Sequence, residues 1–505
     1  MAQPLQSINL IAPGFKGVNT EDSPLAQDPA FADVADNAVI DKRGRIASRK
    51  GINVLTTNKT ALGSDHVHRI HHFYDESGNE IIFSTGNNKI LTGTATLTDA
   101  TPSSYSITAN NWKIVNFNNK AYFFQRGFDP LVYDNATGVR TFGTVNSNTT
   151  PATFKCNEAI PGFGRLWIAD NSSEAQTVYW SDLLDGVDFT GGSSGSINVS
   201  KAWPDGHDVI VGLAVHNNLL VIFGEHSILL YQNANTPAVM SLADTVSGVG
   251  CADRNSIQGI GTDVLFLTES GLRSLGRTIQ EKSLPLSDLS INIKTELIAV
   301  IAAETQPVAS IFSPENSFYL ICFPSQQTVY CFDLKGRLEN NAYRVTRWTS
   351  TGHKSFERDK DGTLYIGTSD GIGKYDGYKD NTSSYQFRYF SPGLTFGDPS
   401  RIKFVKKIRP TLVGLNDGRV FVKWAYDFET AFSNYEINVG DQTPAFFGEG
   451  EYGIGTYTGG LLITKRAVQG TGNGGVVTIG LESSINGSEI SVQEINVLAL
   501  IGKTV

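Results

Sequence analysis

Four of the eight histidines fall in one short segment, DHVHRIHHFYD at 65–75. On a β-strand His66, His68 and His72 would share one face, because successive side chains of a strand point to opposite faces. Three imidazoles on one face could bind a metal ion if a carboxylate or a further histidine completed the coordination. The exposed first strand of a sheet explains the same pattern without a ligand, so we expect neither a metal nor any other cofactor.

Sequence patterns typical of catalysis are scarce. The segment RDKDGTLYIG at 358–367 invites comparison with calcium loops, but it is too short for the twelve-residue pattern that ends in a bidentate glutamate. It also lacks the Ser-x-Asp-x-Gly-x-Thr-Trp order of sialidase propellers. The zinc motif His-Glu-x-x-His and the full phosphate-loop pattern do not occur. We therefore expect a protein that is not an enzyme and has no catalytic residues.

One loop has the composition of a sugar site. In KAWPDGHD, Trp203 lies close in sequence to Asp205 and Asp208. Glycan-cleaving sites place paired carboxylates ~5–10 Å apart, and aromatic rings beside them can hold the sugar. A glycan site at these three residues is one hypothesis, and an ordinary structural loop is the other.

A basic row is expected in RIKFVKKIR at 401–409. Strand alternation would place the apolar side chains on the core face and the basic ones on the outer face. The basic row would then be either solvated or in contact with an acidic neighbouring subunit. The candidate interface residues are Arg401, Lys403, Lys407 and Arg409.

A second candidate interface is FFGEGEYGIGTYTGG at 446–460, which is long for a hairpin connection and rich in aromatic residues. We expect it to pack against a neighbouring chain, and a hairpin within one chain is the alternative. Aromatic side chains are common anchors of interfaces. The expected anchors are Phe446, Phe447, Tyr452 and Tyr457.

The elements that must position these residues repeat along the chain. Apolar runs separated by Gly and Asn turns, such as VHNNLLVIFGEHSILLYQ at 215–232, begin near residues 80, 120, 165, 219, 263, 317 and 363. A period of ~40–50 residues with such short strands is typical of propeller blades. The sequence therefore predicts an all-β protein with a β-propeller of about six to seven blades over 62–385. The aromatic residues expected in its core are Trp167, Phe223, Phe266, Tyr319 and Tyr365.

Spacing and composition divide the rest of the chain. Residues 1–61 are broken by prolines and form an expected N-terminal arm, and 386–505 contain strands without blade spacing, which indicates a separate C-terminal β-sandwich. A helix is expected in 288–304, with Asp288 capping its start. Cys322 and Cys331 would come close across a turn, but we expect free thiols there.

Charge and hydropathy restrict the partners. The formal net charge is −9 and is spread along the chain, so tight binding to phosphate backbones is not expected. The N-terminus lacks the features of a signal peptide, and no apolar run reaches 18 residues. We expect a soluble protein that is made in a cytoplasm and has no membrane span.

Several segments resemble a known family. The opening INLIAPGFKGVNTEDSPLAQDPAFADVADNAVIDKRGRIASRKG, then VYWSDLLDGVDF at 178–189 and FSPGLTFGDPSRIKFVKKI at 390–408, are similar to nozzle proteins of short-tailed bacteriophages, also called tail tubular protein B. The resemblance covers most of the chain through short, degenerate motifs. At 505 residues the chain is shorter than the longest nozzles, so their distal insertions would be reduced.

The resemblance implies a structural protein of the virion tail, assembled in the host cytoplasm. Six copies would form a ring below the portal and adaptor, with the propellers outside and the sandwich domains as a platform around the channel. The implied partners are further copies of the chain, the tail adaptor protein, tail fibre, tailspike or needle proteins, and double-stranded DNA that passes without tight binding. The alternative from another class is a tail-associated receptor-binding propeller that binds or cleaves glycan.

Overall fold

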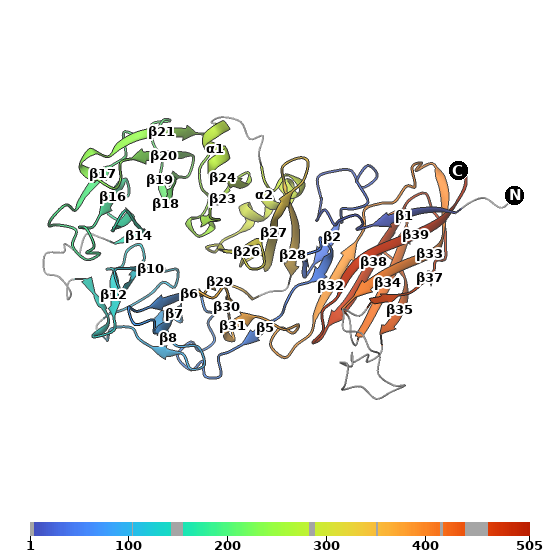
Figure 1. The fold of residues 1–505 in the computed structure, drawn as a ribbon, viewed down its shortest axis with the longest axis horizontal. Coiled ribbons are helices and arrows are strands. Elements are labelled where there is room, and N and C mark those ends of the chain that lie inside the picture. The colour runs from blue at the N-terminus through green and yellow to red at the C-terminus, as the bar shows by residue number, and fades with distance from the viewer. Residues whose placement is uncertain are drawn as a thin grey trace.

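The computed structural model describes residues 5–103, 105–142, 155–281, 288–349, 352–414, 418–439 and 463–504. Strands dominate, and they form two bodies (Figure 1). One body is a ring of small sheets. The other is an elongated pair of sheets, and both ends of the chain lie at its far end. These two bodies are the predicted β-propeller and C-terminal β-sandwich, so the fold class is confirmed.

The ring contains seven blades in the described part of the chain, six with four strands and one with three. Innermost strands of successive blades pack against each other around the ring and close it between the last and the first blade. In chain order the blades are β6 (Arg69–Tyr74), β7 (Glu80–Gly86), β8 (Lys89–Thr92) and β9 (Thr98–Asp99); β10 (Lys113–Phe117), β11 (Lys120–Phe124), β12 (Leu131–Asp134) and β13 (Gly138–Thr141); β14 (Cys156–Gly162), β15 (Arg165–Asn171), β16 (Thr177–Trp180) and β17 (Gly195–Asn198); β18 (Ile210–His216), β19 (Leu219–Gly224), β20 (Ser227–Gln232) and β21 (Ser241–Ser247); β22 (Gln258–Gly259), β23 (Val264–Thr268) and β24 (Gly271–Ser274); β25 (Ala309–Ser313), β26 (Phe318–Phe323), β27 (Thr328–Arg337) and β28 (Tyr343–Thr349); and β29 (Ser355–Arg358), β30 (Leu364–Thr368) and β31 (Gly371–Tyr375) with β5 (Ile52–Val54).

The last blade takes its outer strand from the start of the chain. β5 pairs antiparallel with β31, and Ile52 lies opposite Tyr375. The ring is thus closed by hydrogen bonds between its two ends. The predicted propeller range 62–385 omits this strand, because the repeat is counted from the first complete unit and a three-residue strand carries no periodicity of its own.

The second body is a sandwich of two sheets. The seven-stranded sheet contains β1 (Gln6–Leu10), β3 (Ala38–Ile40), β4 (Ile46–Ser48), β33 (Arg401–Val413), β36 (Ile463–Lys465), β37 (Val468–Gln469) and β39 (Ser491–Thr504). The facing strands are β2 (Val34–Asp36), β32 (Tyr385–Phe390), β34 (Gly418–Tyr426), β35 (Ser433–Val439) and β38 (Val477–Ile485). Ile408 and Val497 from the first sheet share one buried cluster with Val422 and Leu481 from the second. Four strands of the N-terminal arm therefore belong to the sandwich.

A single sheet of nine strands joins the two bodies. It runs from blade strands β25–β28 through β2 into β32, β38, β34 and β35. β2 is parallel to β28 with Asp36 opposite Arg347, and antiparallel to β32 with Asp36 opposite Arg388. Because hydrogen-bonded strands cross the boundary, the propeller and the sandwich are fixed relative to each other.

Helices are few and short. The expected helix in 288–304 is present as α2 (Lys294–Ala303), preceded by the 3₁₀ turn η5 (Ile291–Ile293), and Asp288 accepts the backbone N–H of Ser290 at 2.9 Å instead of capping α2. A second helix, α1 (Leu275–Glu281), was not expected. Two further 3₁₀ turns are η3 (Pro237–Val239) and η4 (Arg254–Ser256).

The predicted core aromatics are confirmed. Trp167, Phe223, Phe266 and Tyr319 are fully buried and Tyr365 is 5% exposed. The four cysteines are buried and free, as expected for Cys322 and Cys331. These two do not face each other, since Cys322 lies opposite Val329 and Cys331 opposite Leu320.

We predict that Trp167→Ala lowers the free energy of unfolding by about 3–5 kcal/mol, because it leaves a large cavity in a close-packed blade. The ring of Trp167 lies 5.4 Å from that of Trp180, and its Nε1 donates to the carbonyl of Gly162 at 3.0 Å. Urea denaturation measures the change. Tyr435→Ala is the control, since Tyr435 is 53% exposed and its loss should cost about 0.5 kcal/mol or less. Equal losses of the free energy of unfolding in the two variants would contradict the position of Trp167 in the core of its blade.

Candidate functional site at the propeller axis and the outer sandwich face

The end of the N-terminal arm is anchored by a buried arginine. Arg49 is 1% exposed and donates from Nη1 and Nη2 to the two carboxylate oxygens of Asp380, at 2.8 and 2.6 Å. Its Nε donates to Asn37 Oδ1 at 3.1 Å, and its guanidinium lies 4.1 Å from the centre of the Tyr385 ring. Arg49 thus ties the arm to residues that follow the last blade and begin the sandwich.

The neighbouring residues of this motif are structural as well. A Cβ at Gly51 would lie 1.9 Å from the carbonyl oxygen of Lys379, so only glycine fits. Asp41 Oδ1 accepts the N–H groups of Arg43 and Arg45 at 2.8 and 3.0 Å and shapes the turn between β3 and β4. The arm motif that carries the family resemblance is therefore a framework, with no feature of a catalytic site.

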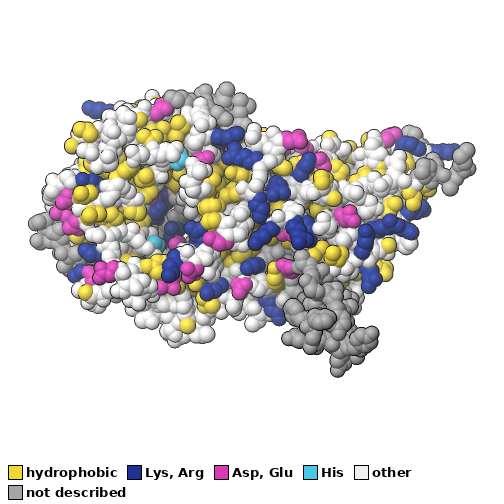
Figure 2. Space-filling view, viewed as in Figure 1, with side chains coloured by type: hydrophobic (Ala, Val, Ile, Leu, Met, Phe, Trp, Pro, Cys, Tyr) yellow, Lys and Arg dark blue, Asp and Glu magenta, His cyan; other side chains and the backbone are white. Residues whose placement is uncertain are grey.

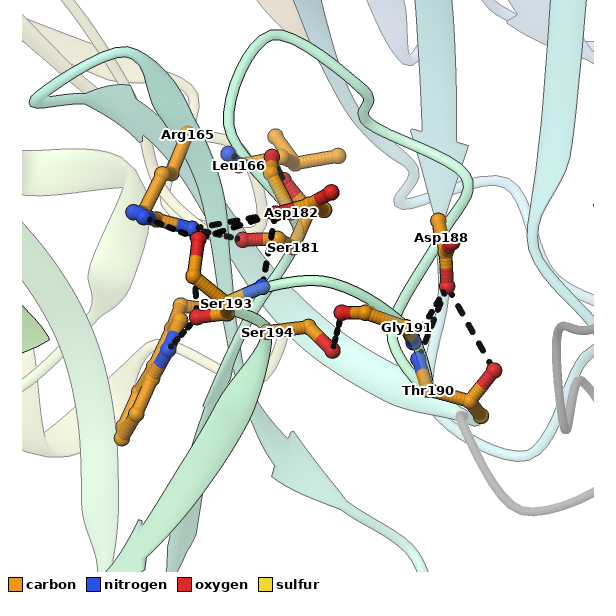
Figure 3. A network of polar contacts seen from close by, with 10 residues as sticks. Arg165, Leu166, Ser181, Asp182, Asp188, Thr190, Gly191, Ser193 and Ser194 are labelled. Atoms are coloured by element: carbon orange, nitrogen blue, oxygen red, sulfur yellow. Dashed lines mark hydrogen bonds and ion pairs between the residues drawn. The ribbon is translucent and has the colours of Figure 1, made fainter. Parts of the chain in front are cut away.

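The second motif, VYWSDLLDGVDF, shapes a loop at the edge of the third blade. Figure 3 shows Arg165, Ser181, Asp182 and Ser193 pointing toward one another between β15 and the loop at 182–194. Arg165 Nη2 donates to Ser193 Oγ at 2.7 Å, and Asp182 Oδ1 accepts both the backbone N–H and the hydroxyl of Ser193 at 2.9 Å. These contacts tie the loop to the blade.

The same loop contains the letters of a hydrolase motif. Residues 191–195 read GGSSG, which fits the Gly-x-Ser-x-Gly pattern. That motif needs its serine on a turn between a strand and a helix, whereas Ser193 lies in a loop that leads into strand β17. Its hydroxyl is bound to Asp182, and none of its contacts is with a histidine. The match is one of composition only.

The predicted glycan residues do not form a sugar platform. Trp203 is 4% exposed and donates from Nε1 to Gln176 Oε1 at 2.7 Å. Asp208 is 3% exposed, and its carboxylate accepts the N–H groups of Val209, Glu225 and His226 at 2.8–3.0 Å. Asp205 accepts the hydroxyl of Ser247 at 2.6 Å. A buried ring and a saturated carboxylate leave no face for a glycan.

The predicted basic row on β33 is only partly correct. β-Bulges between Arg401 and Lys403 and between Val405 and Lys407 interrupt the alternation. Lys403 consequently points inward, is fully buried, and donates from Nζ to the carbonyls of Gly475, at 2.7 Å, and Asp398. A bulge adds one residue and so moves the side chains beyond it to the other face.

The outer face of the seven-stranded sheet is a mixture of basic and apolar side chains. Lys407 lies opposite Leu498 and Arg409 opposite Asn496, while Phe404 lies opposite Leu500. All six side chains are partly exposed. We call this surface the outer sandwich face. The other predicted anchors, Phe446, Phe447, Tyr452 and Tyr457, lie outside the described residues.

The histidine cluster is divided among separate partners. His68 Nε2 lies 3.1 Å from Asp65 Oδ1, His71 Nε2 lies 2.7 Å from Asn116 Oδ1, and His72 Nδ1 lies 2.6 Å from Glu80 Oε1. Within the described ranges no group of three or more potential ligand residues is arranged to hold a metal ion. No helix in the part of the chain described is long and apolar enough to cross a membrane.

Sequence reasoning missed a set of ionisable groups near the propeller axis. They lie on innermost strands, and Figure 2 shows charged side chains around the hollow at the centre of the ring. Lys113 Nζ on β10 lies 2.8 Å from Glu158 Oε1 on β14, and His71 on β6 lies 3.9 Å from Glu357 on β29. The sequence contained a clue to these residues, because each is an ionisable residue within or beside the apolar segment that forms the innermost strand of a blade.

Burial perturbs this axial cluster. It raises the pKa of Glu357 to about 7, although Arg69, Arg358 and Lys113 oppose the shift. It lowers the pKa of His71 to about 4 and also lowers the pKa of Lys113. Ionisable groups with shifted pKa values in a cavity are a common property of binding sites and also of structural ion pairs.

Comparison with known proteins adds little beyond the propeller. No protein-family model matches the chain, and the curated proteins include no match. The extracellular domain of the putative one component system BT4673 from B. thetaiotaomicron is 11% identical with a TM-score of 0.40, over 67% of this chain and 41% of that one. The WD40 β-propeller domain of Doa1 is 12% identical with a TM-score of 0.33, over 64% of this chain and 96% of that one. The Pan2 WD40 domain of Neurospora crassa is 8% identical with a TM-score of 0.36, over 65% and 94%.

We predict that Glu357 makes the protein less stable as pH rises from 5 to 8. Below its unfolded pKa, about 4.5, the carboxyl is protonated in both states. Above it the unfolded chain ionises while the folded chain does not until about pH 7, so stability is lost over this window. Between pH 5 and pH 8 the free energy of unfolding of the wild type should fall by on the order of 2 kcal/mol more than that of Glu357→Gln, as measured by urea denaturation. Glu269→Gln, which changes an exposed turn, should show the same pH dependence of stability as the wild type. If the wild type instead showed the same pH dependence as Glu357→Gln, the raised pKa of Glu357 would be refuted.

Proposed function

We propose that this protein is a structural component of a bacteriophage tail, a nozzle subunit that assembles into a ring and lets DNA pass. The proposal begins from the similarity of the arm, the YWSD loop and the β33 region to tail nozzle proteins. It is supported by the physical character of the outer sandwich face. Its stoichiometry of six copies, and its contacts with an adaptor and with tail fibre, tailspike or needle proteins, are parts of the same proposal.

The outer sandwich face is the observation that carries the proposal. Leu498, Leu500 and Phe404 are partly exposed together on one flat sheet surface, bordered by Lys407 and Arg409. Apolar side chains with arginine and an interspersed charge are common at subunit interfaces. The face lies at the end of the molecule away from the propeller, so a neighbour could pack there without touching the blades (Figure 1).

The connection between the two bodies also suits a subunit of a ring. A ring that conducts DNA under load needs subunits that do not bend at a linker. Here a continuous sheet and the buried Arg49–Asp380 pair join propeller and sandwich. The propeller then offers rigid loop faces on which other tail proteins could dock.

The charges of the outer sandwich face predict salt-dependent assembly. We expect the purified protein to form a closed ring visible by negative-stain microscopy, and Lys407→Glu with Arg409→Glu to weaken its assembly tenfold or more in sedimentation velocity. Opposite charges across an interface attract more weakly as salt rises, so assembly should also weaken between low and high salt.

The matched control for this experiment is Lys201→Glu with Lys360→Glu, which makes the same change of charge at two exposed propeller positions. It should leave assembly unchanged. A wild type that stays monomeric at about 10 µM, with and without a tail adaptor, would contradict the proposal, because subunit interfaces of standard size hold at such concentrations.

A second prediction concerns DNA. The net charge is −9, and the basic side chains of the outer sandwich face are few. Passage of DNA requires a wall that does not hold phosphates, whereas tight binding needs many lysines and arginines in contact with them. The isolated subunit should therefore show a Kd above about 1 µM for duplex DNA at physiological salt in fluorescence anisotropy. A nanomolar Kd that rises steeply with salt would point to a genome-anchoring role instead.

A further inference from the structure

A cavity of about 240 Å³ lies at the centre of the propeller, on the side where the innermost strands begin. Its walls come from segments at or just before β6, β10, β22, β25 and β29, which belong to five different blades. These are the innermost strands of their blades, so the residues at their starts lie around the axis of the ring. The cavity is therefore formed by five of the seven blades and belongs to no single blade.

The lining of this cavity has one sign of charge. Arg69 and Lys354 contribute cations, and Asn111, Asn255 and Gln306 contribute amides. His68 contributes an imidazole whose Nε2 lies 3.1 Å from Asp65 Oδ1. No aspartate or glutamate is among the residues that line it. In a chain with a net charge of −9, a cavity with cations and amides but no carboxylate is a local reversal of charge.

Arg69 is the cation of the cavity lining with the most unpaired hydrogen-bond donors. Among the described residues its guanidinium has neither a hydrogen bond nor an ion pair within 4 Å, and its buried Nε has no partner. Buried guanidinium donors normally bind carboxylates or phosphates, and leaving them unpaired is costly. Arg69 lowers the pKa of Glu357, but no hydrogen bond or ion pair within 4 Å joins the two among the described residues.

The two other cations at or behind the cavity wall, Lys354 and Arg254, are not paired with a carboxylate of the described residues either. Lys354 Nζ donates to the neutral oxygen Gln306 Oε1 at 2.8 Å and has no carboxylate within 4 Å among the described residues. Behind the wall, Arg254 is 4% exposed, donates from Nη2 to the carbonyl of Asn111 at 2.7 Å, and has a buried Nη1 without a partner.

Two nearby carboxylates contact groups other than Arg69 and Arg254. Glu158 is paired with Lys113, and Asp253 accepts the backbone N–H groups of Asn255 and Val308 at 2.7 and 3.0 Å. Buried polar groups in proteins are normally satisfied. Arg69 lines the cavity and Arg254 lies directly behind its wall, so two arginines with unsatisfied buried donors are close to the place where an anion could enter.

We propose that this axial cavity binds a small oxyanion, the carboxylate or phosphate group of a metabolite-sized molecule. Arg69 would bind the anion through its fork of N–H groups, Lys354 would contribute charge at the wall, and the amides of Asn255 and Gln306 would bind its polar substituents. A volume of about 240 Å³ is sufficient for phosphate or citrate. The site is independent of the proposed tail function.

Isothermal titration calorimetry of the full chain with inorganic phosphate and with citrate, against sodium chloride at equal ionic strength, tests the site. We expect a Kd of roughly 10 µM to 1 mM for at least one of the two anions, and the stronger of them identifies phosphate or carboxylate as the preferred group. Arg69→Gln and Lys354→Gln should each weaken that binding tenfold or more. Glu357→Gln removes a carboxyl group near Arg69 whose pKa is about 7, so it should tighten the binding severalfold at pH 8 and leave it unchanged at pH 6.

Lys201→Gln is the matched control, since it removes one exposed charge on the propeller far in sequence from the cavity and should leave the Kd unchanged. Circular dichroism confirms that each variant is folded, and Lys354→Gln gives a second test if Arg69→Gln is not. Absence of binding to both anions, or equal binding by the wild type and Lys354→Gln, would overturn the proposal. Equal losses in Lys201→Gln and Arg69→Gln would also overturn it, because they would show an unspecific effect of charge.

Discussion

A buried guanidinium holds the two bodies of this protein together. Removing Arg49 from water costs several kcal/mol, and only good geometry compensates for that cost. Here the geometry is complete: two hydrogen bonds to Asp380, one to Asn37, one to the carbonyl of Lys50 and the face of Tyr385. The partners come from the arm, from the segment after the last blade and from β32 of the sandwich. The arm is therefore part of the interior, and the positions of β2, β4 and β5 depend on it.

Charge fixes the register of the sheet that crosses between the bodies. Glu296 on α2, Arg347 on β28, Asp36 on β2, Arg388 on β32, Glu482 on β38 and Lys423 on β34 form a row of alternating sign, with contacts of 2.5–3.6 Å. Most of these residues lie directly opposite each other across neighbouring strands. A slip by one residue would turn every side chain to the other face and place like charges or apolar groups in contact. The row is thus a source of specificity even where each exposed pair adds little stability.

The sequence was sufficient for the propeller, the sandwich and the buried aromatics, because period and residue type reflect burial directly. It was insufficient where a single residue decides which face a side chain points to or whether it is buried. The bulges in β33 turned Lys403 from the expected outer row into the core, and a bulge leaves no mark on composition. Trp203 looked exposed because its neighbours are polar, yet those neighbours bind backbone groups. The charges at the axis escaped notice because each stands alone in its own strand, and only closure of the ring brings them together.

The position of β5 has a consequence for synthesis of the chain. Residues 52–54 leave the ribosome about 317 residues before their partner strand β31 begins, and β1 waits still longer for β39. At ~5–20 residues per second the ring stays open for about 15 to 60 s after its closing strand has been made. During this time Arg49 lacks Asp380 and Tyr385, and the apolar residues of the arm lack the later strands against which they pack. The arm therefore cannot complete its pairing until the end of the propeller and the last strand of the sandwich have been made.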